Sequence, residues 1–158
     1  MASTLEAREM QYLSVYDIVW INTTLAGRAL PFDYVNLEEA MAAQYSYGVS
    51  TNVPAQAANL LQILVLKRPF AFGNVRTAFV AVTAFLIANG YALAVDDAAA
   101  AEIVRAVAEG RTTAEDAIGA LAAPAGESMG SAMTLRALVT LIFNGRSEAI
   151  RQLARGDE

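Results

Sequence analysis

An uncharged run from Thr77 to Val95 constrains the fold of this chain more than any other feature of its sequence. The run approaches the length of a membrane span. Asn89 and Gly90 interrupt it where a helix would end, and the continuous segment before them is short for a bilayer. We therefore expect a buried apolar helix from Asn74 to Asn89, and not a membrane helix.

The rest of the chain predicts helices with clear starts and stops. Candidate N-caps precede the apolar stretches, and Pro54 suits the first position of a helix. The expected caps are Ser14 (with Asp17 in a capping box), Asn36, Asp96 and Thr113, and the expected stops are Gly27, Gly48, Gly90 and Gly110. A last helix is expected from Ser131 to about Phe143, either ending there or continuing past Gly145. Strand patterns are nearly absent, although residues 46–53 suit a short extended flap.

These elements predict an all-α fold, with six to seven helices around one central hydrophobic helix. The 158 residues fit one domain with a sizeable core. We expect residues 1–123 to form the helical domain and residues 124–158 to form a C-terminal helical extension packed on it. Tyr12, Tyr16 and Trp20 are expected to anchor the first helix in the core, in preference to forming an exposed aromatic face.

Composition excludes several kinds of chemistry. The chain has no cysteine and no histidine, which removes thiolate catalysis, the usual general base and the commonest metal ligand. A net charge of −5 argues against nucleic acid and against an anionic membrane as partners. The N-terminal stretch has acids and no apolar core, so no secretory signal is expected and a cytoplasmic location is predicted.

The stretch KRPFAFGNVRTAF, from Lys67 to Phe79, joins two apolar helices. The N–H groups at a helix start have no partner within the helix, and the helix dipole favours an anion beside them. Gly73 allows close approach of a ligand, and three cations stand nearby: Lys67, Arg68 and Arg76. The pattern indicates either a phosphate-type site or an ordinary solvated turn, and we weigh the two equally.

The same stretch resembles the signature loop of the Fic/Doc (death-on-curing) family, which reads HPFxDGNKRTA in the Doc toxins of toxin–antitoxin pairs. The shared residues are Pro69, Phe70, Gly73, Asn74, Arg76, Thr77 and Ala78. LEEAMAAQ, FLIANGYAL and SVYDIVWIN resemble neighbouring family segments, so the resemblance covers roughly residues 12–122. It implies a compact helical protein that moves AMP or a phosphoryl group from a nucleotide to a hydroxyl of a target protein.

The chain departs from the family motif at its catalytic positions. Arg68 stands where the family has the histidine base, and a guanidinium has no acceptor and stays protonated. Phe72 replaces the acid that holds Mg²⁺, and it offers no oxygen to a metal that needs oxygen ligands. Val75 replaces the usual lysine. Glu39, Tyr45 and Tyr47 are conceivable substitute bases, but the sequence does not place them.

The resulting hypothesis is a Fic/Doc-like pseudoenzyme that binds a nucleotide or phosphate through Arg68, Gly73, Asn74, Arg76 and Thr77, without Mg²⁺. Whether it is an enzyme at all stays open. One alternative is an active Doc-type transferase that uses ATP, and another is a structural helical interaction module. A protein target, an antitoxin-like partner and a homo-oligomer also stay open.

Overall fold

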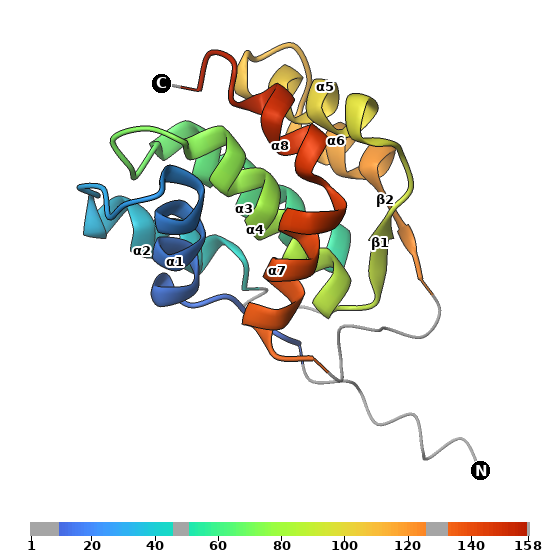
Figure 1. Cartoon of the computed structure of the whole chain (residues 1–158). Coiled ribbons are helices and arrows are strands. Elements are labelled where there is room, and N and C mark those ends of the chain that lie inside the picture. The colour runs from blue at the N-terminus through green and yellow to red at the C-terminus, as the bar shows by residue number, and fades with distance from the viewer. Residues whose placement is uncertain (1–9, 46–50, 126–132, 158) are drawn as a thin grey trace.

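The computed structural model describes residues 10–45, 51–125 and 133–157 (Figure 1). Within these ranges the chain forms eight helices and one small antiparallel sheet, so the predicted all-α class is confirmed. The elements are α1 (Val15–Ala26), α2 (Tyr34–Ala43), α3 (Val53–Lys67), α4 (Asn74–Ala88), β1 (Tyr91–Leu93), α5 (Asp97–Ala108), α6 (Ala114–Leu121), β2 (Ala122–Pro124), α7 (Leu135–Gly145) and α8 (Ser147–Leu153).

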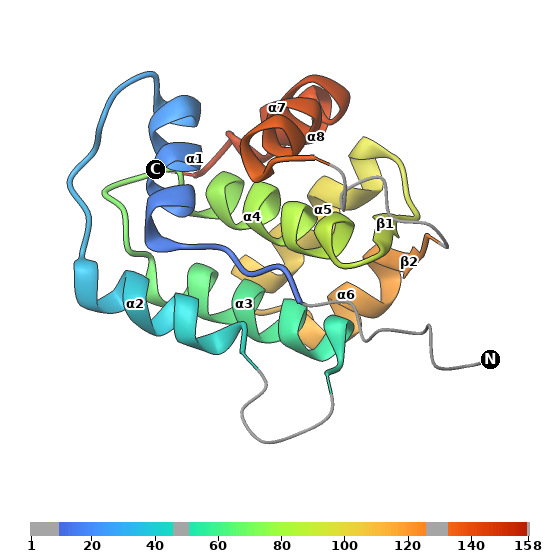
Figure 2. The same cartoon turned by 90° about the horizontal axis from the view of Figure 1, so that it is seen from below.

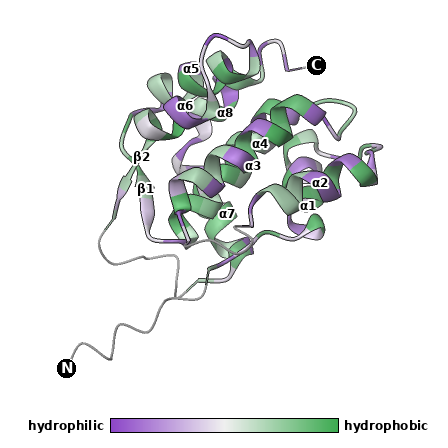
Figure 3. Cartoon of the chain, turned by 180° about the vertical axis from the view of Figure 1, so that it is seen from behind, coloured by the Kyte–Doolittle hydropathy of each residue, from purple (hydrophilic) through white to green (hydrophobic). Residues whose placement is uncertain are grey.

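Helix α4 is the central helix, as predicted. Every residue from Thr77 to Leu86 is buried, and α4 packs against α1, α3 and α7 (Figure 2). Helices α2 and α3 instead mix hydrophilic and hydrophobic residues along their lengths (Figure 3), as helices with one solvent-facing side do. Asn89 caps α4, and Gly90 follows at φ 91°, which ends the helix as expected. No helix in the described ranges is long and apolar enough to span a membrane.

Most helix starts follow the predicted caps, with one exception in α2. Ser14 and Asp17 form a reciprocal capping box at α1, while Asp96 and Thr113 cap α5 and α6. The expected cap Asn36 was wrong. Asp33 caps α2, because its carboxylate accepts a hydrogen bond from the Asn36 amide at 2.9 Å, and Asn36 lies inside the helix. The expected stop Gly48 and residues 46–50 of the flap lie outside the described residues.

The last expected helix is two helices, which brings the described helices to eight in place of six or seven. Thr134 caps α7, and Ser131 lies outside the described residues. The chain bends at Arg146, whose guanidinium donates to the Val95 carbonyl at 2.8 Å and to the Asp97 carboxylate at 3.1 Å. Helix α7 packs on α4 and α8 packs on α5, so both cover the core formed by the earlier helices.

The expected anchoring of helix α1 holds for Trp20, which packs against the core, but not for Tyr16. Tyr16 is 81% exposed and Tyr12 is 36% exposed, while Ile18 and Ile21 are fully buried. Trp20 is half-buried, with the Arg136 guanidinium 4.5 Å from its ring centroid. Core anchoring by Tyr16 was therefore wrong, because the helical repeat turns the side chains at 18 and 21 inward and that of Tyr16 outward.

Candidate functional site

The turn between α3 and α4 is shaped by a buried asparagine. Asn74 accepts a hydrogen bond from the Phe70 amide at 2.9 Å and donates one to the Phe70 carbonyl at 2.8 Å. Its side chain, in a residue only 2% exposed, thereby closes the turn over residues 70–74. Arg68 ends α3 at φ 45°, and Gly73 precedes α4 at φ 78°. The side chain of Asn74 thus serves the turn, and only its backbone remains for a ligand.

A second asparagine ties the turn to α1. Asn22 is buried, and its Nδ2 donates to the Phe72 carbonyl at 3.2 Å and to the Thr77 hydroxyl at 3.1 Å. Its Oδ1 is the one buried side-chain polar atom without a hydrogen-bond partner among the described residues. A Cβ added at Gly73 would lie 3.3 Å from Asn22 Nδ2, so the close packing here suits glycine. The side chain of Thr77 is therefore engaged inside the protein.

The N-terminus of α4 holds a carboxylate from the far end of the sequence. Asp157 Oδ1 accepts from the Val75 amide at 3.0 Å, and Oδ2 accepts from the Arg76 amide at 3.0 Å. The Arg76 side chain adds a third bond, from Nε to Oδ2, also at 3.0 Å. Asp157 is only 3% exposed. The helix-start amides expected to be free are thus occupied at Val75 and Arg76.

These donors form the kind of set that holds an anion. Two consecutive amides at a helix start lie beside the positive end of the helix dipole, and a guanidinium adds a full charge. The Arg76 side chain is 16% exposed and that of Asp157 is 1% exposed, so water screens the pair weakly. The three donors therefore neutralise and orient the Asp157 carboxylate as they would one face of a phosphate group.

The segment after α8 brings Asp157 to this position. Gly156 adopts φ 78°, and the Asp157 amide donates to the Ala154 carbonyl at 3.4 Å, which turns the chain back after the helix. The Gly73 amide then donates to the Asp157 carbonyl at 3.2 Å. Figures 1 and 2 show this segment ending beside the α3–α4 turn. Backbone and side chain of Asp157 therefore both dock on the turn.

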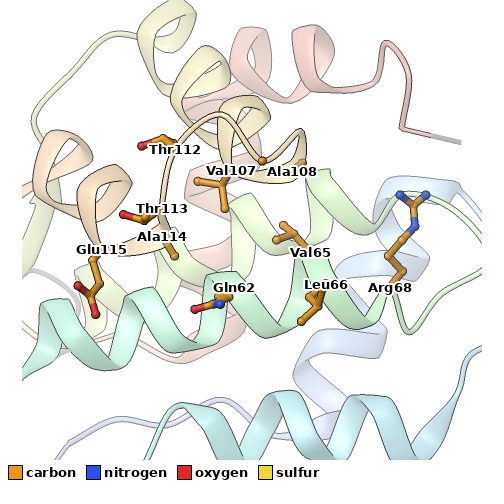
Figure 4. A pocket seen from close by; sticks show the side chains of 11 residues that line it. Gln62, Val65, Leu66, Arg68, Val107, Ala108, Thr112, Thr113, Ala114 and Glu115 are labelled. Carbon is orange, nitrogen blue, oxygen red and sulfur yellow. The ribbon is translucent and has the colours of Figure 1, made fainter.

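Two of the three departures from the resembled motif, Arg68 and Phe72, lie at different places around the turn. Arg68 is exposed and lies at one end of a pocket of about 670 Å³ between the end of α3 and the α5–α6 connection (Figure 4). Phe72 is half-buried, and the Arg28 guanidinium lies 5.8 Å from its ring centroid. Neither side chain belongs to the donor set that holds Asp157.

The residues of the turn do not fit a Mg²⁺ site of the kind the resemblance implies. Phe72 supplies no oxygen, and Asp157 is already bound by three N–H donors. In residues 10–45, 51–125 and 133–157, no three His, Cys, Asp or Glu side chains come together as metal ligands.

The candidate substitute bases have other contacts. Glu39 forms an ion pair with Lys67 at 3.1 Å, and the Tyr45 ring lies 4.2 Å from that of Tyr12. Tyr47 lies outside the described residues. These contacts place Glu39 beside the last residue of α3 and Tyr45 beside the residues before α1.

No protein-family model, curated protein or solved structure matches this chain in the comparisons made. The site therefore stands on its own geometry. Sequence reasoning found Gly73, Asn74 and Arg76 but missed Asn22 and Asp157. Nothing in the RGDE stretch points to the turn at residue 73, because the two segments meet only through tertiary folding.

Proposed function

We propose that this protein is a cytoplasmic, catalytically inactive anion-binding protein of the Fic/Doc type. Its site at the start of α4 takes a phosphate group, as in a nucleotide, when Asp157 leaves. The observation that carries the proposal is the Asp157 carboxylate held by two amides and Arg76. A carboxylate and a phosphate oxygen pair use the same N–H donors, so the bound side chain stands in for the ligand.

The inactivity follows from the chemistry of two side chains. Arg68 cannot accept a proton, and a general base usually contributes about 10²–10⁴-fold to a rate. Phe72 cannot coordinate a cation, so the charge stabilisation that a metal supplies is missing as well. Transfer of AMP or a phosphoryl group therefore has neither a base nor a metal at the positions where the resemblance places them.

Binding is tested by calorimetry with inorganic phosphate, AMP, ADP and ATP, each with and without Mg²⁺. We expect at least tenfold tighter binding of ADP to Asp157→Ala than to the unmodified chain, with no requirement for Mg²⁺. Arg76→Ala in the Asp157→Ala background should remove the gain, because it deletes the only charged donor of the set. Absence of binding to the folded Asp157→Ala variant at millimolar nucleotide would refute the proposal and leave a structural helical module.

Inactivity is tested separately, with labelled ATP and a cell extract. We expect no transfer of label by the unmodified chain or by its Asp157→Ala variant. The Arg68→His/Phe72→Asp double variant is the comparison, because it restores both residues of the resembled motif. Transfer of label by the unmodified chain, lost in Arg76→Ala, would establish the alternative of an active transferase.

A further inference from the structure

Most of the exposed aromatic side chains come from one stretch of the chain. Among the described residues, all the exposed large hydrophobic side chains except Leu66 and Leu141 belong to residues 12–45. We call five of them the tyrosine surface: Tyr12, Tyr16, Tyr34, Val35 and Tyr45, which are 36%, 81%, 55%, 64% and 38% exposed. Large exposed apolar patches typically mark binding surfaces.

The two helices that carry most of this surface, α1 and α2, pack on each other. The rings of Tyr12 and Tyr45 are 4.2 Å apart between centroids. The pKa of Tyr34 is raised, first by its hydrogen bond to Glu38 and the charge of Glu38, and to a smaller extent by burial and by Tyr16. The surface thus runs from the residues before α1, along the start of α1, to both ends of α2.

An open hollow of about 580 Å³ lies beside these tyrosines, between the start of α1 and α2. Its apolar floor includes Leu13 and Met41, which are 3% and 7% exposed. Val35, Tyr45 and the carboxylates of Glu38 and Glu39 also line it. The hollow therefore offers an apolar contact with acidic groups beside it.

The charged side chains that line the hollow are both acidic. Its lining includes Glu38 and Glu39 and no lysine or arginine among the described residues. Lys67 pairs with Glu39 at 3.1 Å, but both side chains are more than a third exposed, so this pair is weak and exchangeable. Tyrosine faces attract a cation, and a guanidinium both stacks on aromatic rings and binds a carboxylate with two hydrogen bonds.

We propose that the tyrosine surface and the hollow beside it bind an arginine-bearing apolar segment of a partner protein. The guanidinium lies against a tyrosine face and pairs with Glu38, while an aliphatic or aromatic neighbour enters the hollow over Leu13 and Met41. Arginine is favoured over lysine because only its planar group stacks and pairs at once. This surface is independent of the Asp157 site, so either proposal can fail alone.

The test is a selection of phage-displayed random peptides on the immobilised full chain, with a Tyr16→Ala/Tyr34→Ala double variant selected in parallel. Both positions are exposed, so the variant should keep the circular dichroism of the unmodified chain, although Tyr34→Ala removes the hydrogen bond to Glu38. We expect peptides enriched on the unmodified chain to carry arginine next to an apolar residue. Enrichment without arginine, or equal enrichment on the double variant, would overturn the proposal.

An enriched peptide, labelled with fluorescein, then gives affinities by anisotropy. Glu38→Gln should weaken binding by about tenfold, which corresponds to about 1.4 kcal/mol for the lost charge pair. Leu141→Ala is the matched control, because Leu141 is 47% exposed on α7 and should leave the affinity unchanged. Equal loss in both variants would contradict the proposal. So would a homodimer in sedimentation equilibrium that Tyr16→Ala abolishes, since a second copy would then cover the surface.

Discussion

Removal of the Asp157 carboxylate is the sharpest perturbation that this structure offers. In Asp157→Ala the amides of Val75 and Arg76 and the Arg76 guanidinium each lose an ionised acceptor. A hydrogen bond to a charged group contributes about 1.5–3 kcal/mol, and breaking a buried ion pair costs about 3–5 kcal/mol. The effects are not additive, and water can reach the vacated donors from the surface. We therefore expect a loss of about 2–3 kcal/mol in the free energy of unfolding.

For a chain of this length, each kcal/mol lowers the melting temperature by about 2–4 °C, so the expected decrease is about 4–12 °C. Urea denaturation of the unmodified chain, Asp157→Ala, Arg76→Ala and the double variant completes a double-mutant cycle. We expect a coupling free energy of about 1–2 kcal/mol between the two side chains. A coupling of this size would show that the two substitutions act on one shared interaction and not through separate effects on stability. Glu109→Gln is the control, because Glu109 forms an exposed pair with Arg111 and should change stability by less than about 0.5 kcal/mol. A loss in Asp157→Ala no larger than in this control, or zero coupling, would refute the assignment of Asp157 as the anion at α4.

Three further predictions concern single positions. In urea denaturation, Gly73→Ala should lower the free energy of unfolding by about 1–2 kcal/mol more than Gly27→Ala. Both glycines have positive φ, but only at Gly73 would a Cβ meet neighbouring atoms, at 3.3 and 3.4 Å. Equal losses in the two variants would contradict this reasoning. Asn74→Ala should lower the free energy of unfolding by about 2–4 kcal/mol, because it leaves the buried Phe70 amide and carbonyl unpaired. The control Asn36→Ala loses one hydrogen bond of 3.3 Å and should lower it by less than about 1 kcal/mol. Similar losses in the two variants would contradict the role of Asn74. The pKa of Tyr34 is raised above 10.0, first by its hydrogen bond to Glu38 and then by the charge of Glu38. This contact therefore stabilises the fold below about pH 10, and the stabilisation is lost as the pH rises through the raised pKa. NMR titration of ¹³C-labelled tyrosine should show the Tyr34 pKa fall in Glu38→Gln, and an unchanged value would contradict the contact.

The sequence predicted the parts of the fold that depend on local patterns. Helix α4 was predictable because an uncharged apolar run with an Asn-Gly stop has few alternatives to a buried helix. Ser14, Asp96 and Thr113 were predictable as caps because a cap acts on amides within three residues along the chain. Asn36 failed because Asp33, three residues earlier, is also a good cap, and local propensity alone does not rank the two.

The parts that could not be predicted depend on contacts between distant segments. Asp157 meets Arg76 across 81 positions, and no pattern around either residue encodes the meeting. Asn22 meets Thr77 across 55 positions in the same way. For Tyr16, the helical period was visible but its phase relative to the core was not. At about 100° per residue, Tyr16 lies nearly opposite Ile18 and Ile21 around the helix, so a rotation of about half a turn would exchange the buried and exposed faces.

The tethered carboxylate sets a condition on any ligand of the α4 site. A side chain held on the same molecule competes at an effective concentration on the order of millimolar, however weak its own contacts are. A phosphate group offers the same three donors more charge and one more oxygen, but it binds from solution and loses translational freedom on binding. Inorganic phosphate therefore gains little over Asp157, and an effective ligand must make contacts beyond the phosphate group. Removal of Asp157 should tighten the binding of phosphate and of ADP by the same factor, because both lose the same competitor, and the additional groups of ADP are what bring its affinity into the measurable range.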